Sequence, residues 1–221
     1  ISKEEEEKGK TYLSYNVVIK DSLDEKLYVA FQVLEYLLFN IPGAPVKKAV
    51  IEAGIGNDVF SSYDNGIKQP TFAMISQGAN EEDKDRFLEI IKGTLKNIVE
   101  NGLDKKSLKA AINILEFQER EGDFGRYPKG LMYGLKMFDS WLYDDEKPFI
   151  HIETESTFAF LKEQINTNYY EELIQTYFLE NSHSSFVILK PKKNMAEMIE
   201  KNCKDKLASY KESLSKEELL Q

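Results

Sequence analysis

The side chains best able to hold a metal ion in this sequence are two histidines, His151 and His183. A zinc hydrolase needs at least three converging ligands, most simply two histidines one turn apart on a helix. These two histidines lie far apart in the sequence, and neither has a second histidine at that spacing. We therefore expect no zinc site within this chain.

Two pairs of acidic residues could in principle donate and accept protons: Asp144 with Asp145, and Glu153 with Glu155. A carboxyl group that acts as a general acid near neutral pH needs a raised pKa, which apolar surroundings supply. Both pairs lie in polar connections, so we interpret them as solvated loop charges.

The segment Gly54-Ile55-Gly56 resembles the start of a dinucleotide-binding loop. The third glycine of that loop is missing, because position 59 is Val, and the residues before Gly54 have a helical pattern rather than a strand pattern. The segment is more typical of a helix C-terminus followed by a turn.

Four aromatic residues follow one another at helical and loop spacing: Phe138, Trp141, Tyr143 and Phe149. We interpret them as part of the core, and the alternative is that they face a peptide-binding cavity. None of these candidates makes a complete catalytic set. We therefore assign no catalytic, cofactor-binding or metal-binding residue to this chain.

The composition is that of a globular domain: 221 residues, 42% hydrophobic and 30% charged, favour one α+β domain. The formal net charge of −9 argues against binding to nucleic acid or to an anionic membrane. The one cysteine, Cys203, cannot form an internal disulfide and has the apolar neighbours Ile199 and Leu207, which favours a small apolar filler. A reducing compartment is compatible with it, and we expect a cytoplasmic location.

The first half of the chain predicts a strand, two helices and an antiparallel meander. Residues 12–19 alternate like a half-buried strand, and Ser22 with Glu25 predicts a capping box before a helix over 27–39. A short helix over 45–52 precedes two extended segments, 59–63 and 71–77, which a turn at 64–66 joins.

The second half predicts mostly helices. Asn80, Asp104 and Asn168 can each begin one, and Leu131, Leu135, Phe138 and Leu142 mark another. Residues 185–189 are continuously apolar and predict a central strand. We expect one mostly antiparallel sheet with residues 186–189 inside it, covered mainly on one face by the helices that begin at Ser22, Asn80 and Asp104.

The C-terminal segment predicts a helix from Asn194 whose apolar stripe is narrow: Ile199, Cys203, Leu207, Tyr210 and Leu214. Such a stripe suits a helical hairpin, and we expect this helix to protrude from the core. Ser215 and Glu218 form a capping box that opens a further helix. With the polar start at Ile1, this leads us to expect a piece of a longer protein.

An ordered set of segments resembles the second, non-catalytic domain of presequence-protease-type zinc metallopeptidases in the pitrilysin/insulinase group. The segments that carry the resemblance are Ile41-Pro42-Gly43-Ala44-Pro45, Lys48 to Gly56, Gln77-Gly78, Val99-Glu100-Asn101-Gly102, Glu116-Phe117-Gln118 and Trp141-Leu142-Tyr143-Asp144. It implies three parts: a polar lead-in over 1–10, an α+β peptidase-chamber domain over 11–193, and the start of a helical hairpin linker over 194–221.

The resemblance also implies where the chemistry of such enzymes lies. Their first domain carries the zinc motif His-x-x-Glu-His, which this sequence lacks, so zinc is expected in the parent enzyme and not in this chain. Their last domain supplies an Arg and a Tyr to the substrate. Ile51 stands here where that Arg would be, and Asn57 lies near the Tyr position. The resemblance therefore implies that this domain does not donate those groups.

Two functions from different classes remain open at this point. The first is a non-catalytic, chamber-forming domain of a zinc-dependent endopeptidase that degrades unstructured peptides, with the remaining domains of the same chain as partners. The second is a stand-alone interaction or assembly module with an inactive peptidase-like fold. The opened helix at Ser215 favours the first, and we expect the chain by itself to be inactive.

Overall fold

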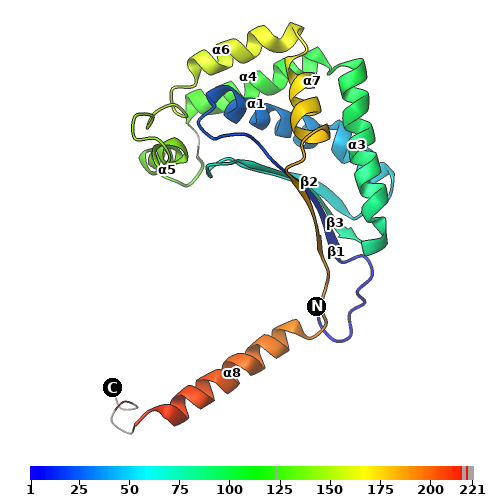
Figure 1. Cartoon of the computed structure of the whole chain (residues 1–221), viewed down its shortest axis with the longest axis vertical. Helices are drawn as coiled ribbons and strands as arrows, with labels where there is room; N and C mark the ends of the chain where they lie inside the picture. Colours follow the sequence, from blue (N-terminus) through cyan, green and yellow to red (C-terminus); the bar gives the residue numbers. More distant parts are fainter. Residues whose placement is uncertain (123, 216–217, 219–221) are drawn as a thin grey trace.

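The computed structural model describes residues 1–122, 124–215 and 218, in which helices cover one side of a single sheet (Figure 1). The strands are β1 (Thr11–Val18), β2 (Asp58–Asp64), β3 (Thr71–Ala79) and β4 (Ser184–Leu189). The α-helices are α1 (Glu25–Glu35), α2 (Pro45–Glu52), α3 (Lys84–Asn101), α4 (Lys105–Glu121), α5 (Lys129–Trp141), α6 (Glu155–Glu163), α7 (Tyr169–Ile174) and α8 (Met195–Ser213). These elements confirm an α+β fold.

The sheet has the strand order β2-β3-β1-β4, and every neighbouring pair is antiparallel. In the middle of β1, Tyr15 lies opposite Met74 of β3 on one side and Phe186 of β4 on the other. β1 buries Leu13, Tyr15 and Val17, and the residues between them face the other side. This alternation is what a sheet with one covered face requires.

The prediction that residues 186–189 form an internal strand is wrong, because β4 is an edge strand of the sheet. Phe186 and Ile188 pack against the core, whereas Val187 and Leu189 are 51% and 63% exposed. A strand that is apolar on both sides can therefore lie at an edge when one of its faces remains uncovered.

Helix α1 lies at the centre of the core and continues through a π-helical turn over Tyr36–Asn40. By length and composition alone, Glu25–Glu52 could cross a membrane, but 56% of its apolar window is buried inside the domain. Packing in the core accounts for this apolar character. The predicted capping box is wrong in its residue: Asp24, not Ser22, accepts the hydrogen bond from the Leu27 N–H, and Ser22 is buried.

The predicted starts of α3 and α4 are confirmed. The Asp83 carboxylate accepts a hydrogen bond from the Asn80 N–H at 3.0 Å, and the Asp104 carboxylate accepts one from the Ser107 N–H at 2.8 Å. Gly102, at φ 84°, ends α3. At the start of α7, the Thr167 hydroxyl accepts the Tyr169 N–H, and Asn168 makes no side-chain cap.

Helix α6 begins at Glu155, where the sequence predicts a polar connection. Glu155 lies in the first turn of this helix, and Thr157, Phe158 and Leu161 are buried against the core. The i, i+3 spacing of Phe158 and Leu161 was the available signal.

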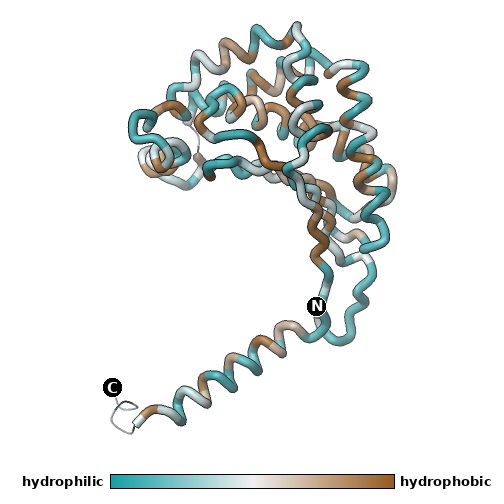
Figure 2. The backbone as a smooth tube through the Cα atoms, in the orientation of Figure 1, coloured by the Kyte–Doolittle hydropathy of each residue, from teal (hydrophilic) through white to brown (hydrophobic). Residues whose placement is uncertain are grey.

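Helix α8 extends away from the rest of the fold (Figure 1), and apolar residues recur along it among hydrophilic ones (Figure 2). None of its residues is buried. Cys203 is exposed, so its interpretation as a packed apolar filler is wrong. The Ser215 hydroxyl and the Glu218 carboxylate make the hydrogen bonds of the predicted capping box, while the helix predicted to follow lies outside the described residues.

Candidate functional site

The two histidines lie in separate parts of the fold. His151 is buried, with 1% of its surface exposed, in the connection between α5 and α6, whereas His183 is exposed just before β4. Within residues 1–122, 124–215 and 218, no group of three or more His, Cys, Asp and Glu side chains could hold a metal ion.

His151 belongs to a buried polar cluster. Its ring stacks on Tyr28 of α1 at 3.7 Å between centroids, and the Tyr28 hydroxyl donates a 2.8 Å hydrogen bond to the Asp139 carboxylate on α5. Burial, aided by the Lys136 charge, lowers the pKa of His151 to about 4, so the imidazole is neutral at pH 7. Burial also raises the pKa of Asp139, while its hydrogen bond to Tyr28 opposes that rise.

These polar contacts attach α5 to the domain. Lys136 donates a 2.6 Å hydrogen bond to Glu119 of α4, and Asp139 accepts from Tyr28 of α1. Lys129 also reaches the Glu121 carbonyl at 2.7 Å. All three charged residues within α5 thus have partners on the domain's side. We call Tyr28, Glu119, Lys136, Asp139 and His151 the α5 anchor.

The predicted core role is wrong for three of the four aromatic residues around α5, whereas Tyr143 is half-buried. Phe138 and Trp141 stack on each other at 5.9 Å, yet both are exposed, and so is Phe149. With Leu131, Leu135 and Leu142 they carry a surface without charged side chains, whose residues are 43% to 67% exposed. We call Leu131, Leu135, Phe138, Trp141 and Leu142 the α5 face.

The turn at Gly54-Ile55-Gly56 ends α2, as predicted. Gly54 donates to the Ile51 carbonyl and Ile55 to the Val50 carbonyl, while Ile55 is buried. Gly56, at φ 78°, lies so close to β3 that a Cβ atom would come within 2.2 Å of the Ser76 hydroxyl. This glycine is therefore required by packing between the turn and the sheet, not by a phosphate.

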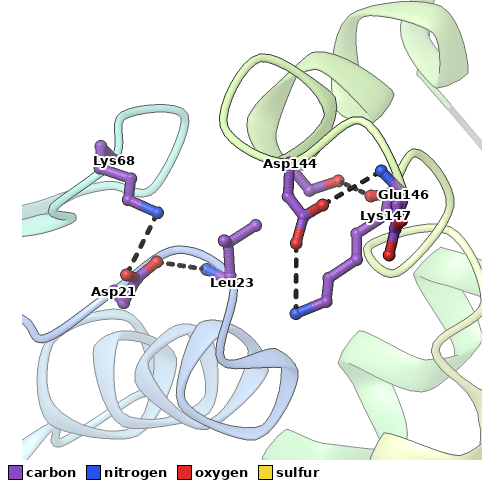
Figure 3. Close-up of polar contacts among 7 residues, drawn as sticks. Asp21, Leu23, Lys68, Asp144, Glu146 and Lys147 are labelled. Atoms are coloured by element: carbon purple, nitrogen blue, oxygen red, sulfur yellow. Dashed lines mark hydrogen bonds and ion pairs between the residues drawn. The ribbon is translucent and has the colours of Figure 1, made fainter.

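Asp144 makes local contacts within its own loop (Figure 3). Its carboxylate accepts the Glu146 N–H at 3.1 Å and pairs with the Lys147 ammonium at 3.4 Å. A comparable arrangement joins Asp21 to Lys68 at 3.3 Å and to the Leu23 N–H at 2.9 Å. These contacts fit the interpretation of Asp144 as a loop charge, and Asp145 beside it is exposed.

Glu153 and Glu155 line a cavity of about 750 Å³ between α4 and α6. Glu116 on its wall is already paired with Arg120, at 2.9 Å, and with Lys162. The other acidic side chains that line it are Glu25 and Glu119. Among the described residues that line the cavity there is no histidine or cysteine, so its possible ligands are oxygen atoms, from the carboxylates and from Thr154 and Ser156.

The uncovered face of the sheet confirms the prediction that helices cover mainly one face. Val187, Ser14, Ile75 and Phe60 lie side by side on β4, β1, β3 and β2 by the strand register. In Figure 1 this face lies on the side away from α1 and α3, with α5 and α8 near opposite ends of the sheet. We call these four residues the open-face row. The polar-apolar alternation in β1 and β3 was the signal for an uncovered face.

The two positions compared with substrate-binding residues carry neither an Arg nor a Tyr. Ile51 is exposed at the end of α2, and the Asn57 side chain lies against Gly78, where an added Cβ would come within 2.6 Å of its amide nitrogen. Ile51 and Asn57 therefore offer neither a cationic nor a phenolic group.

The fold and these sites define an α+β domain with one open sheet face, whose described residues contain no cluster able to hold a metal ion. The family model for the Peptidase M16 inactive domain matches residues 1–115. The chain belongs to this family.

Longer relatives contain a segment similar to the whole chain. Protein HypA of Clostridium perfringens is 42% identical over 219 residues, which cover 99% of this chain and 22% of the relative. Presequence protease 1 of Arabidopsis thaliana is 29% identical over 96% of this chain and 20% of its own length. The chain thus spans about a fifth of the length of these curated relatives.

A solved structure shares the fold at low sequence identity. The inactive peptidase domain of a proposed zinc protease from Bordetella parapertussis superimposes with a TM-score of 0.63 at 11% identity, over 83% of this chain and 92% of that one. This likeness confirms the α+β fold.

Proposed function

We propose that this chain is a chamber-forming domain of a longer zinc-dependent endopeptidase that degrades unstructured peptides. The carrying observation is the open sheet face, which the domain leaves uncovered along the open-face row. Exposed Val187 lies in one row with Ser14, Ile75 and Phe60, so this face can contact extended peptides through apolar side chains and through polar neighbours such as Ser14.

In this proposal another domain of the protein holds the zinc ion, and this domain contributes surface to the chamber. The described part of this chain offers no three-ligand set, so the zinc ion and the nucleophilic water would be held by another domain of the same protein. This domain would contribute surface, shape and peptide contacts. The lead-in over 1–10, the domain over 11–193 and the linker from 194 would then be its three parts, in a cytoplasmic enzyme.

The alternative, a stand-alone assembly module, is not favoured. The curated relatives contain the matching segment within chains about five times as long, so its surfaces would meet other domains of the same protein. This argument also makes those domains the proposed partners.

The test uses the full-length protein with an unstructured fluorogenic peptide as substrate. Ile75→Lys on the open face should raise KM severalfold and leave kcat and zinc content nearly unchanged, because it alters peptide contacts and not the metal. Glu89→Lys on the exposed side of α3 is the control and should leave KM unchanged.

Two outcomes would refute the proposal. One is an unchanged KM in Ile75→Lys with the fold intact by circular dichroism. The other is zinc-dependent hydrolysis of the same peptide by the 221-residue chain alone.

A further inference from the structure

The α5 face is unusual because the helix directs its charges inward and its apolar residues outward. Lys136 and Asp139 pair with Glu119 and Tyr28 of the domain. Leu131, Leu135, Phe138 and Leu142 recur at steps of four, three and four and are all exposed. Exposed apolar patches that are continuous along a helix mark interaction surfaces.

Two glycines within α5 give a second, independent observation. Gly130 and Gly134 lie one turn apart beside the apolar stripe, and a Cβ atom on either would meet no atom within 4 Å. Glycine is less favourable than alanine in the interior of a helix. Packing within the described part of this chain does not require a glycine at position 130 or 134. Glycines at this spacing allow another backbone to approach a helix closely.

The shape of the surface restricts what can cover it. One face of a single helix is a convex ridge, whereas sites for peptides and small molecules are concave. A ridge with small residues beside it fits a groove between helices or beside a sheet. Pairing two copies of this chain would bring together two chains of net charge −9, which the uncharged ridge does nothing to offset.

We propose that the α5 face docks into an apolar groove on another segment of the same full-length protein. The length of the relatives supports this partner, since 78% to 80% of each lies outside the matching segment, by subtraction of the 22% and 20% covered. The proposal rests on the proposed function only in placing this chain within a longer protein. The α5 anchor would hold α5 with its apolar side outward, so that this side can enter the groove.

The test measures the rate of thiol labelling in proteins that carry Cys203→Ser. One variant adds Phe138→Cys on the α5 face, and the matched control adds Glu89→Cys on the exposed side of α3. In the 221-residue chain both thiols should react at similar rates at every protein concentration. In the full-length protein the thiol at position 138 should react at least about tenfold more slowly than in the 221-residue chain, because burial blocks the reagent. The labelling rate of the control thiol at position 89 should be the same in both proteins.

Three results would overturn the proposal. Equal labelling of positions 138 and 89 in the full-length protein would leave the ridge uncovered. Protection in the 221-residue chain that grows with concentration would make a second copy the partner. Protection in the full-length protein only after addition of an unstructured peptide would make the peptide the occupant. None of these readouts needs peptidase activity, so they are independent of the KM test.

Gly134→Ala tests the close approach directly. In the 221-residue chain it should raise the Tm slightly through helix propensity. In the full-length protein it should speed labelling at position 138, because the new methyl group separates the ridge from its groove. Unchanged labelling would contradict the close approach.

Discussion

Helices α3 and α5 carry apolar stripes of almost the same spacing, but the stripe of α3 is buried and that of α5 is exposed. In α3 the stripe Phe87, Ile91, Leu95 and Ile98 is buried in the core, and its charged residues face outward. In α5 the stripe is exposed, and Lys136 and Asp139 face the domain. The comparison teaches that periodicity identifies an apolar face of a helix but not the surface that covers it.

The two helices are also held by different forces. Apolar burial holds α3, and its strength grows with the area removed from water. Hydrogen bonds and ion pairs of the α5 anchor hold α5, and their strength depends on protonation states and geometry. Substitutions and pH should therefore affect the two helices differently.

The largest expected difference comes from the same substitution in each helix. Leu95→Ala should lower the free energy of unfolding by about 3 kcal/mol, because it leaves a cavity in the core. Leu135→Ala should change it by less than about 0.5 kcal/mol, because the side chain is exposed. Urea denaturation of the 221-residue chain measures both. Equal losses would show that α5 is part of the core.

The α5 anchor should make stability depend on pH through His151. Its pKa of about 4 lies below the usual 6.5, so the unfolded state binds more protons between these values. This contribution is fully present above pH 6.5 and is lost as the pH falls towards 4. The full loss is about 3 kcal/mol, at 1.36 kcal/mol for each pKa unit.

The variant that isolates this contribution is His151→Phe, which keeps a flat ring against Tyr28. Its free energy of unfolding should fall less steeply than that of the unsubstituted chain between pH 6.5 and 4. Asp139 acts in the opposite direction, because its raised pKa favours the folded state at low pH. Parallel pH profiles for the two proteins would rule out a role for His151.

The smallest effect is expected at α8, which lacks both kinds of attachment. Deletion of residues 204–221 should lower the free energy of unfolding by about 1 kcal/mol or less, because no residue of α8 is buried. A thermal melt of the 221-residue chain and its deletion variant measures this. Unfolding on deletion would show that α8 is integral to the domain.

Much of the fold could be predicted because local signals and burial agree. The alternation in residues 12–19, the acids after Asn80 and the cap at Asp104 each matched the element that formed. The Ser22 cap failed because Asp24, two residues later, is an equally good cap, and only packing decided between them. The resemblance supplied the family, which no single spacing could.

The sequence predicts an uncovered sheet face and a protruding C-terminal helix, but it does not show which apolar side chains stay exposed, because an apolar face has the same pattern whether or not another surface covers it. By residue type, Val187, Leu189, Phe138 and Trp141 are typical of a core, yet all four are exposed. An exposed apolar side chain has the same chemistry as a buried one, so the sequence does not distinguish the two. The buried pairs on the inner side of α5 join residues far apart in the chain, such as Tyr28 and Asp139. Such pairs are set by tertiary packing.

The hydrogen bonds of Ile1 have a mechanical consequence. The Ile1 carbonyl accepts the Asn194 N–H at 3.0 Å, and Tyr12 lies opposite Leu189 where β1 and β4 leave the sheet at the same end. A tensile load applied between the N-terminus and α8 would therefore pull β1 and β4 apart from that end. Their hydrogen bonds run perpendicular to the strands and would break one pair after another, so the sheet would open at this corner first and β3 would remain joined to β2.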